Sequence, residues 1–119
     1  MYNIQERLTM IVDAVTIIEN RMVSIKKAED FIADEQSIIL LDAICMRLQT
    51  IGENLNKVFK VDPDLVKNHI QIDPLPIINF RNIVSHAYES LDYEIIYAIC
   101  TTELAPIKKH IENYLFKQP

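Results

Sequence analysis

Apolar side chains recur at steps of three and four along almost the whole chain, and this periodicity constrains the fold more than any other feature. The first such pattern predicts a helix from about residue 3 to the low twenties, with a buried stripe of Ile4, Leu8, Ile11, Val12, Val15 and Ile18. The longest pattern begins after Asp34, a good N-cap, and its expected core positions run from Ile38 to Val58. Only one residue, Gly52, is a glycine. The expected fold class is therefore all-α.

Three shorter segments complete the expected helices. Asp62 is placed to cap a brief third helix, with Pro63 at its first position. A fourth helix is expected over residues 74–88, and a fifth is expected to start near Asp92 and to be kinked at Pro106. The apolar stripe predicted for the fifth helix consists of Leu91, Ile95, Ala98, Ile99 and Thr102. Together these segments predict an up-down bundle of four to five helices in one domain, residues 1–119.

Charge and cysteine usage narrow the classes of protein to consider. The net charge of −5 argues against a broad basic surface, so any polyanion must be bound locally. Cys45 and Cys100 lie in apolar helical patterns, which favours buried free thiols and a reducing cytoplasm. No apolar run approaches the ~18 residues that a membrane span needs, and the first residues are not typical of a signal peptide. The protein is expected to be cytoplasmic, with no membrane partner.

The stretch FRNIVSHAYES, residues 80–90, gathers polar side chains with chemical capability. Ile83, Val84, Ala87 and Leu91 would share the inward face of the fourth helix. Asn82 and His86 are four positions apart, close enough for the amide to orient the imidazole. Arg81, Ser85 and Tyr88 form an adjacent row. The sequence therefore predicts one polar patch on the outer surface of the helix.

These residue types suit the cleavage of RNA. The arginine fork fits phosphate oxygens, and histidine moves protons near neutral pH. RNA carries its own nucleophile, the 2′-hydroxyl, so cleavage needs no metal if protons are moved and charge is stabilised. One imidazole does not readily make both proton transfers. A symmetric dimer that pairs two copies of Arg81 and His86 is therefore our hypothesis.

Other candidate residues have weaker support. His69 and His110 have no companion at metal-ligand spacing, so exposed helix surface is the preferred interpretation, and neither a metal nor a cofactor is expected. Glu53 could orient a partner group, although a solvated position is favoured. Gly52 lies inside a helix at a cost of about 1 kcal/mol relative to alanine, which indicates a close helix crossing. Tyrosines 93, 97 and 114 are expected in packing or dimer contacts.

The chain resembles the HEPN superfamily, specifically the HepT-like toxins encoded beside minimal nucleotidyltransferase antitoxins. Arg81-Asn82, His86 and Tyr88 fill the R-x4-H-x-Y signature of that family. The triplet 51–53, Ile-Gly-Glu, resembles an element of its second helix, and the triplet 104–106, Leu-Ala-Pro, matches its closing segment. The family often has glycine before the tyrosine, where this chain has Ala87.

The resemblance implies a dimeric, metal-independent endoribonuclease with Arg81 and His86 as the catalytic pair and Asn82 in support. It also implies that a cognate nucleotidyltransferase, using ATP, silences the protein by adenylylating Tyr88. Ser85 and Glu53 are second-tier candidates. The alternative is a catalytically silent HEPN domain that binds nucleotide or docks the nucleotidyltransferase through the same Arg81 and His86.

Overall fold

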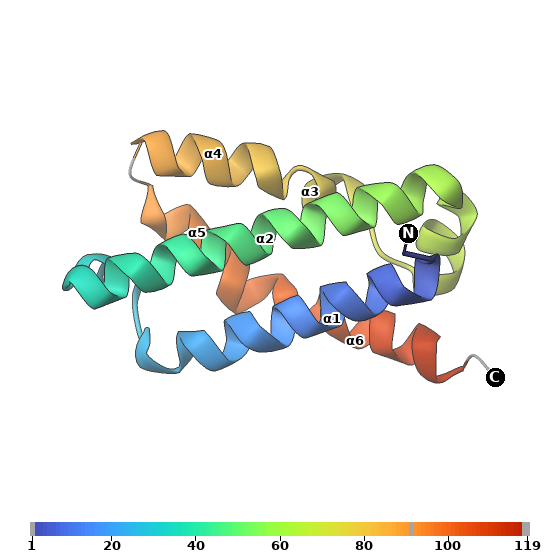
Figure 1. The fold of residues 1–119 in the computed structure, drawn as a ribbon, viewed down its shortest axis with the longest axis horizontal. Coiled ribbons are helices and arrows are strands. Elements are labelled where there is room, and N and C mark those ends of the chain that lie inside the picture. The colour runs from blue at the N-terminus through green and yellow to red at the C-terminus, as the bar shows by residue number, and fades with distance from the viewer. Residues whose placement is uncertain (1, 91, 118–119) are drawn as a thin grey trace.

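The computed structural model describes residues 2–90 and 92–117, without the side chain of Tyr88. In this part of the chain the α-helices are α1 (Ile4–Arg21), α2 (Glu35–Val61), α3 (Pro74–Ile78), α4 (Phe80–Ser90), α5 (Tyr93–Thr102) and α6 (Leu104–Phe116) (Figure 1). Shorter elements are the 3₁₀ helices η1 (Met22–Ser24) and η2 (Ala28–Ile32) and the π-helix η3 (Leu65–Ile70). The expected all-α up-down bundle is confirmed, and its extents are 46 × 26 × 24 Å.

Helices α1 and α2 form an antiparallel pair with the most extensive contact between any two elements of the bundle (Figure 1). The carboxylate of Asp34 accepts a hydrogen bond of 2.8 Å from the Ser37 amide, so the predicted cap of α2 is confirmed. Side chains at a spacing of three and four from both helices are fully buried, including Leu8, Ile11, Ile18, Ile44, Leu48, Ile51 and Leu55. Burial of this apolar area is the main force that holds the bundle together.

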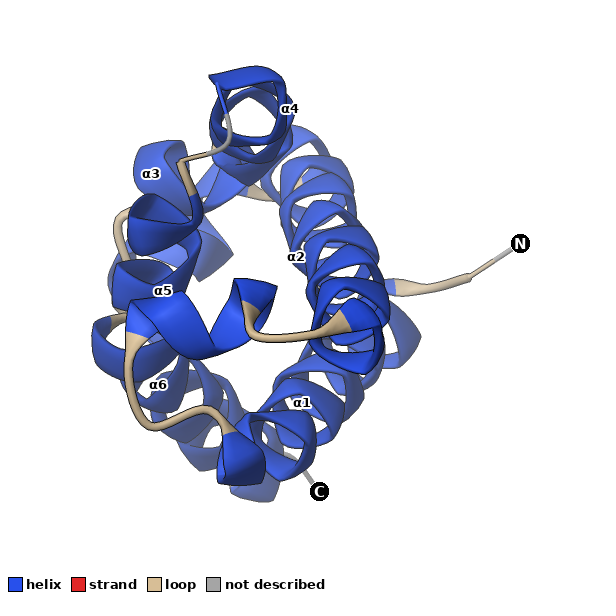
Figure 2. Cartoon of the chain, turned by 90° about the vertical axis from the view of Figure 1, so that its left-hand side faces the viewer, coloured by secondary structure: helices blue, strands red, loops and turns tan. Residues whose placement is uncertain are grey.

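Helix α4 lies at the periphery of the bundle. Seen end-on, it packs against α2 and faces outward on its other side (Figure 2). Helices α5 and α6 return along the opposite side, where α6 packs against α1 (Figure 2). None of the described helices combines the length and the apolar character that a membrane span requires.

The short elements are held by specific hydrogen bonds. The Asp30 carboxylate accepts from the Lys26 and Lys27 amides at the start of η2. The Tyr97 hydroxyl donates to the Lys26 carbonyl at 2.8 Å, and its ring meets Phe31 edge-on. The packing role expected for Tyr97 is therefore confirmed.

The third helix begins as predicted. The Leu65 amide donates to the Asp62 carboxylate at 3.1 Å, and Pro63 lies in the first turn. The turn then widens into the π-helix η3, in which the Gln71 amide reaches back five residues to the Val66 carbonyl.

The predicted fourth and fifth helices are each divided. The fourth is interrupted at Asn79, between α3 and α4, and ends at Ser90. The bend of the last helix lies at Glu103, three residues before Pro106. Proline cannot donate a backbone hydrogen bond to the preceding turn, so α6 starts anew at Leu104 and Pro106 occupies its first turn.

The predicted inward face of the fifth helix is confirmed at Ile99 and wrong at three other positions. Ile95, Ala98 and Thr102 are exposed, while Ile96 and Ile99 are buried, and Leu91 lies outside the described residues. The helix carries adjacent apolar residues, such as Ile95 beside Ile96, so spacing alone could not select the face. Ile38 was also expected in the core but is exposed, at the first turn of α2.

Candidate functional site

The packing of α4 determines which of its residues reach solvent. Phe80, Val84 and Ala87 are buried, at 1–2% of their full exposure. Successive residues of a helix are rotated by about 100° around its axis. The polar side chains at positions between these three buried residues are therefore directed outward. Those exposed polar residues are Arg81, Asn82, Ser85 and His86, which we call the α4 patch. The predicted polar surface of this helix is present.

Arg81 and His86 have no side-chain partner among the described residues. Within the described residues no carboxylate forms an ion pair with the Arg81 guanidinium, and no side chain hydrogen-bonds the His86 imidazole. One helix separates the two residues by about 7.5 Å along its axis and about 140° around it. The two groups of one chain are thus available to a ligand but are not held against each other.

Asn82 has a different partner from the predicted one. Its Nδ2 donates to Oδ1 of Asn79 at 2.9 Å, so the expected bond between Asn82 and His86 is not formed. Asn79 lies in the break between α3 and α4, where its backbone carbonyl also accepts from the Ile83 amide. Sequence reasoning missed Asn79, although its spacing of three residues from Asn82 was the available signal.

Gly52 fixes the place at which α4 begins. A methyl group on its Cα would come within 2.8 Å of the Ile77 carbonyl oxygen and within 3.2 Å of that of Ile78. The predicted close crossing at Gly52 is therefore confirmed. The neighbouring residue, Glu53, is exposed on α2. This contact positions the turn of α4 that carries Arg81.

Ser85 faces a groove between α2 and α4, of about 400 Å³. The groove is lined by Asp42, Cys45, Met46, Gln49, Val84, Ser85 and Glu89. Two of these residues are carboxylates, so a phosphate in the groove would meet like charge. Any anion is instead favoured at the Arg81 end of α4, away from Glu89.

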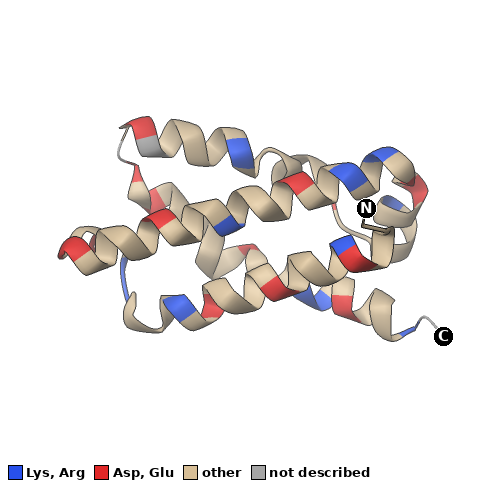
Figure 3. Ribbon diagram, in the orientation of Figure 1, with Lys and Arg blue, Asp and Glu red and all other residues tan. Residues whose placement is uncertain are grey.

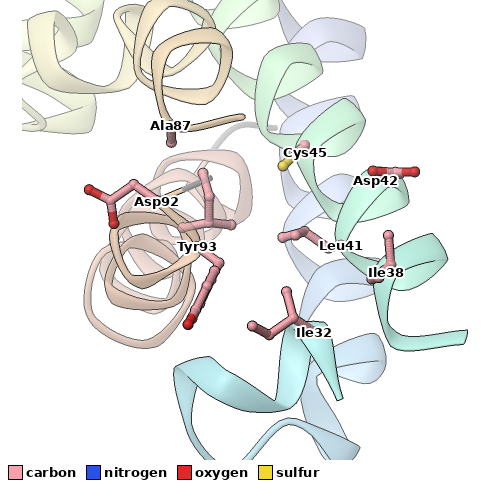
Figure 4. Close-up of a pocket in the computed structure, with 9 residues that line it drawn as sticks. Ile32, Ile38, Leu41, Asp42, Cys45, Ala87, Asp92 and Tyr93 are labelled. Carbon is pink, nitrogen blue, oxygen red and sulfur yellow. The ribbon is translucent and has the colours of Figure 1, made fainter. Parts of the chain in front are cut away.

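A second, apolar pocket of about 200 Å³ lies between η2, α2 and the start of α5 (Figure 4). In Figure 4 the carboxylates of Asp42 and Asp92 point away from its centre, while Ala87 reaches it from α4. The Ala87 methyl group is therefore inside the protein and does not alter the outer face of α4. Alanine in place of the family's common glycine leaves the α4 patch undisturbed.

The two cysteines do not supply a nucleophile. Cys45 is buried and Cys100 partly buried, and both are free, as predicted. Burial, together with the neighbouring Asp42 carboxylate, raises the pKa of the Cys45 thiol to about 11. Burial likewise raises the pKa of Cys100 to about 12. Both thiols are protonated near neutral pH.

The remaining histidines belong to η3 and α6 rather than to α4. His69 is exposed and lies 3.3 Å from the Asp64 carboxylate. His110 is half-buried rather than exposed, because its Nδ1 donates to the Ile70 carbonyl at 3.1 Å. Across the described ranges, no three His, Cys, Asp or Glu side chains cluster in a way that could hold a metal ion.

Tyr88 follows His86 by two residues in α4, and its side chain lies outside the described part of the structure. A family model described as Ribonuclease HepT-like matches residues 4–114, which include the whole of α4. No curated protein and no solved structure shows a significant match. Because the family model covers nearly the full length of the helical bundle, the chain belongs to the HepT-like ribonuclease family.

Proposed function

We propose that the chain is an endoribonuclease toxin that cleaves RNA at the α4 patch of a symmetric dimer. The observation that carries this proposal is the exposure of Arg81 and His86, both without a partner among the described side chains. The exposed guanidinium and imidazole groups do not contribute to the packing of the bundle. Membership of a ribonuclease family explains why arginine and histidine occupy these exposed positions.

The reaction follows from the chemistry of these groups. Neutral His86 takes the proton of the 2′-hydroxyl, whose oxygen attacks the adjacent phosphorus. The bond from phosphorus to the 5′-oxygen then breaks, and a protonated imidazole gives its proton to that leaving oxygen. The products are a cyclic phosphodiester and a free 5′-hydroxyl. Arg81 stabilises the negative charge that builds up on the phosphorane oxygens.

The need for a second copy follows from the spacing within one helix. His86 of one chain cannot reach both sides of the scissile phosphate, and Arg81 lies about 140° around the helix from it. Two α4 helices facing each other across a two-fold axis would supply the acid, the base and both guanidinium groups. Asn82, held by Asn79, would line the same cleft from a fixed position.

A comparison of two histidines tests cleavage. Purified protein is incubated with RNA in a chelator, as the unsubstituted chain, His86→Ala and the matched control His69→Ala. His69 is exposed and belongs to η3 rather than to α4. We expect a rate loss of about 10²–10⁴-fold for His86→Ala, the usual range for general acid-base groups, and no loss for the control. Equal rates for all three proteins would reject His86 as the proton-transfer residue.

We further propose that a cognate minimal nucleotidyltransferase silences the chain at Tyr88. The phenolic oxygen would form a bond to the α-phosphorus of ATP, diphosphate would leave, and the phenolic proton would go to solvent. The added phosphate would place negative charge on the helix that carries Arg81. After co-expression, intact-mass analysis should show adenylyl additions that disappear in Tyr88→Phe and persist in Tyr114→Phe. An unmodified chain after co-expression would contradict this step.

The negative charge of the chain favours the alternative of a silent, nucleotide-binding domain. The net charge is −5, and Glu89 lies one turn beyond Ser85 in α4. Such a domain would bind nucleotide through Arg81 and His86 but leave RNA intact at every concentration. In contrast, a dimeric nuclease should lose activity per chain when it is diluted below the dissociation constant of the dimer.

A further inference from the structure

A pocket of about 480 Å³ lies where the start of α1 meets the C-terminal half of α2. Tyr2 and Arg7 approach it from the first segment, and Lys57, Val58 and Val61 from α2. No carboxylate is among the described residues that line it. In a chain of net charge −5, a pocket with two cations, an aromatic ring and no acidic wall is favourable to an anion.

Arg7 is held in a way that preserves its charge. Its Nη1 donates to Oδ1 of Asn54 at 3.0 Å, and Asn54 is buried, at 5% of its full exposure. The Asn54 amide is anchored in turn by donating to the Thr50 carbonyl at 3.0 Å. No ion pair to Arg7 occurs among residues 2–90 and 92–117. A neutral amide therefore fixes the guanidinium without neutralising it.

Tyr2 adds a stacking surface beside this charge. The Arg7 guanidinium carbon lies 5.7 Å from the centre of the Tyr2 ring, within the range of a cation–π contact. Tyr2 is 57% exposed, so much of the side chain remains accessible. An aromatic ring beside a fixed arginine and a lysine is the combination by which proteins bind single-stranded nucleic acid: bases stack and phosphates pair with the cations.

The pocket and the candidate site share helix α2. Gly52 contacts the start of α4, and Lys57 follows it by five residues, or about 7.5 Å of helix rise. Figure 3 shows Lys and Arg segments at the start of α4, in the C-terminal half of α2 and near the start of α1. A strand that leaves the α4 patch and passes around α2 by about 140° toward its C-terminal end would arrive at the pocket.

We propose that this pocket binds a nucleotide of a single-stranded RNA outside the scissile position, with Tyr2 stacking on its base and Arg7 and Lys57 binding its phosphate. The proposal rests on the ribonuclease function proposed above, because it assigns the pocket to the same RNA strand. It predicts that the protein prefers an unpaired segment, since a base within a duplex is not free to stack on Tyr2.

Binding is measured by fluorescence anisotropy with a labelled single-stranded RNA of about ten nucleotides, in the His86→Ala chain so that the probe stays intact. Tyr2→Leu in that background should weaken binding by about fivefold or more. Lys57→Gln should lower the slope of log affinity against log salt by about 0.7, the value for one phosphate contact. The matched control Lys109→Gln, an exposed lysine on α6, should leave the slope unchanged. Unfolding curves confirm that each variant is folded.

Affinities and salt slopes that do not change in Tyr2→Leu and Lys57→Gln would overturn the proposal. So would labelled AMP that binds in a Tyr2-dependent manner and is not displaced by the RNA, because the occupant would then be a mononucleotide.

The binding assay is independent of cleavage. If the unsubstituted chain binds RNA through Tyr2 but never cleaves it, the proposed nuclease function is rejected and the proposed RNA binding by the pocket is supported. If cleavage depends on His86 while Tyr2→Leu leaves the affinity unchanged, the nuclease function is supported and the proposed RNA binding by the pocket is rejected.

Discussion

Replacing Gly52 with alanine tests the link between helix packing and the position of the α4 patch. The added methyl group would lie 2.8 Å from the Ile77 oxygen, 3.2 Å from the Ile78 oxygen and 3.6 Å from Cβ of Phe80. Ordinary contacts of a Cβ atom begin near 3.4 Å. Both close neighbours are backbone atoms, which cannot rotate away as the end of a side chain could. The segment from α3 to α4 must therefore move.

Two opposing effects determine the size of the loss. Alanine is about 1 kcal/mol more favourable than glycine inside a helix, whereas overpacking a buried site typically costs about 1–3 kcal/mol. Because the obstacles are backbone atoms, we expect the upper part of that range and a net loss of about 1–2 kcal/mol in the free energy of unfolding. For a chain of this size the Tm should fall by about 5–10 °C.

The displacement should also affect catalysis. Below the unfolding transition, a shift of the turn that carries Arg81 should slow RNA cleavage by about tenfold to a hundredfold, as small misplacements of catalytic groups do. The control is Gln36→Ala, an exposed change in the same helix, which should stay within about 0.5 kcal/mol of the unsubstituted protein. A Gly52→Ala protein with an equal or higher Tm would refute the packing argument. Unchanged cleavage would refute the link to α4.

The remaining predictions concern the two thiols and one tyrosine hydroxyl. Because the pKa values of Cys45 and Cys100 are raised, iodoacetamide at pH 8 should label neither thiol in the folded protein, and rapid labelling would contradict their burial. The free energy of unfolding should decrease as the pH rises above about 8.5, because the unfolded chain then loses thiol protons that the folded chain retains up to about pH 11. Tyr97→Phe removes the hydrogen bond to the Lys26 carbonyl and should cost about 0.5–1.5 kcal/mol, whereas Tyr114→Phe, which loses no hydrogen bond within the described residues, should be neutral. Equal Tm values for the two phenylalanine variants would contradict the role given to that bond.

Apolar spacing, helix-capping residues and the single glycine made much of the fold predictable. Spacing located the long helices α1 and α2, and Asp34 and Asp62 cap as their side chains predict. Gly52 was interpretable because a helix accepts an interior glycine at a cost that only a close neighbour explains. In each case one residue type has one strong physical reason to occupy its position.

The failures share a different cause, because each depended on tertiary contacts. The break at Asn79 carries no proline or glycine of its own and lies where the end of α3 passes over Gly52. The partner of Asn82 was missed because Asn79 and His86 each lie about one turn from it, and spacing alone does not select between them. The inward face of α5 was similarly undetermined, because Ile95 and Ile96 are equally apolar and only packing distinguishes them.

The same reasoning separates residues required by the fold from those required by function. Burial of Phe80, Val84 and Ala87 is sufficient to attach α4 to the bundle, so folding sets no requirement for arginine or histidine on the outer face. Exposed side chains without partners contribute little to stability, and their replacement usually changes it by less than about 0.5 kcal/mol. Substitutions of Arg81 and His86 should therefore leave the Tm near its original value while they slow cleavage by at least about 10²-fold. A large fall in Tm would instead make these residues part of the scaffold and would remove the main argument for a catalytic role.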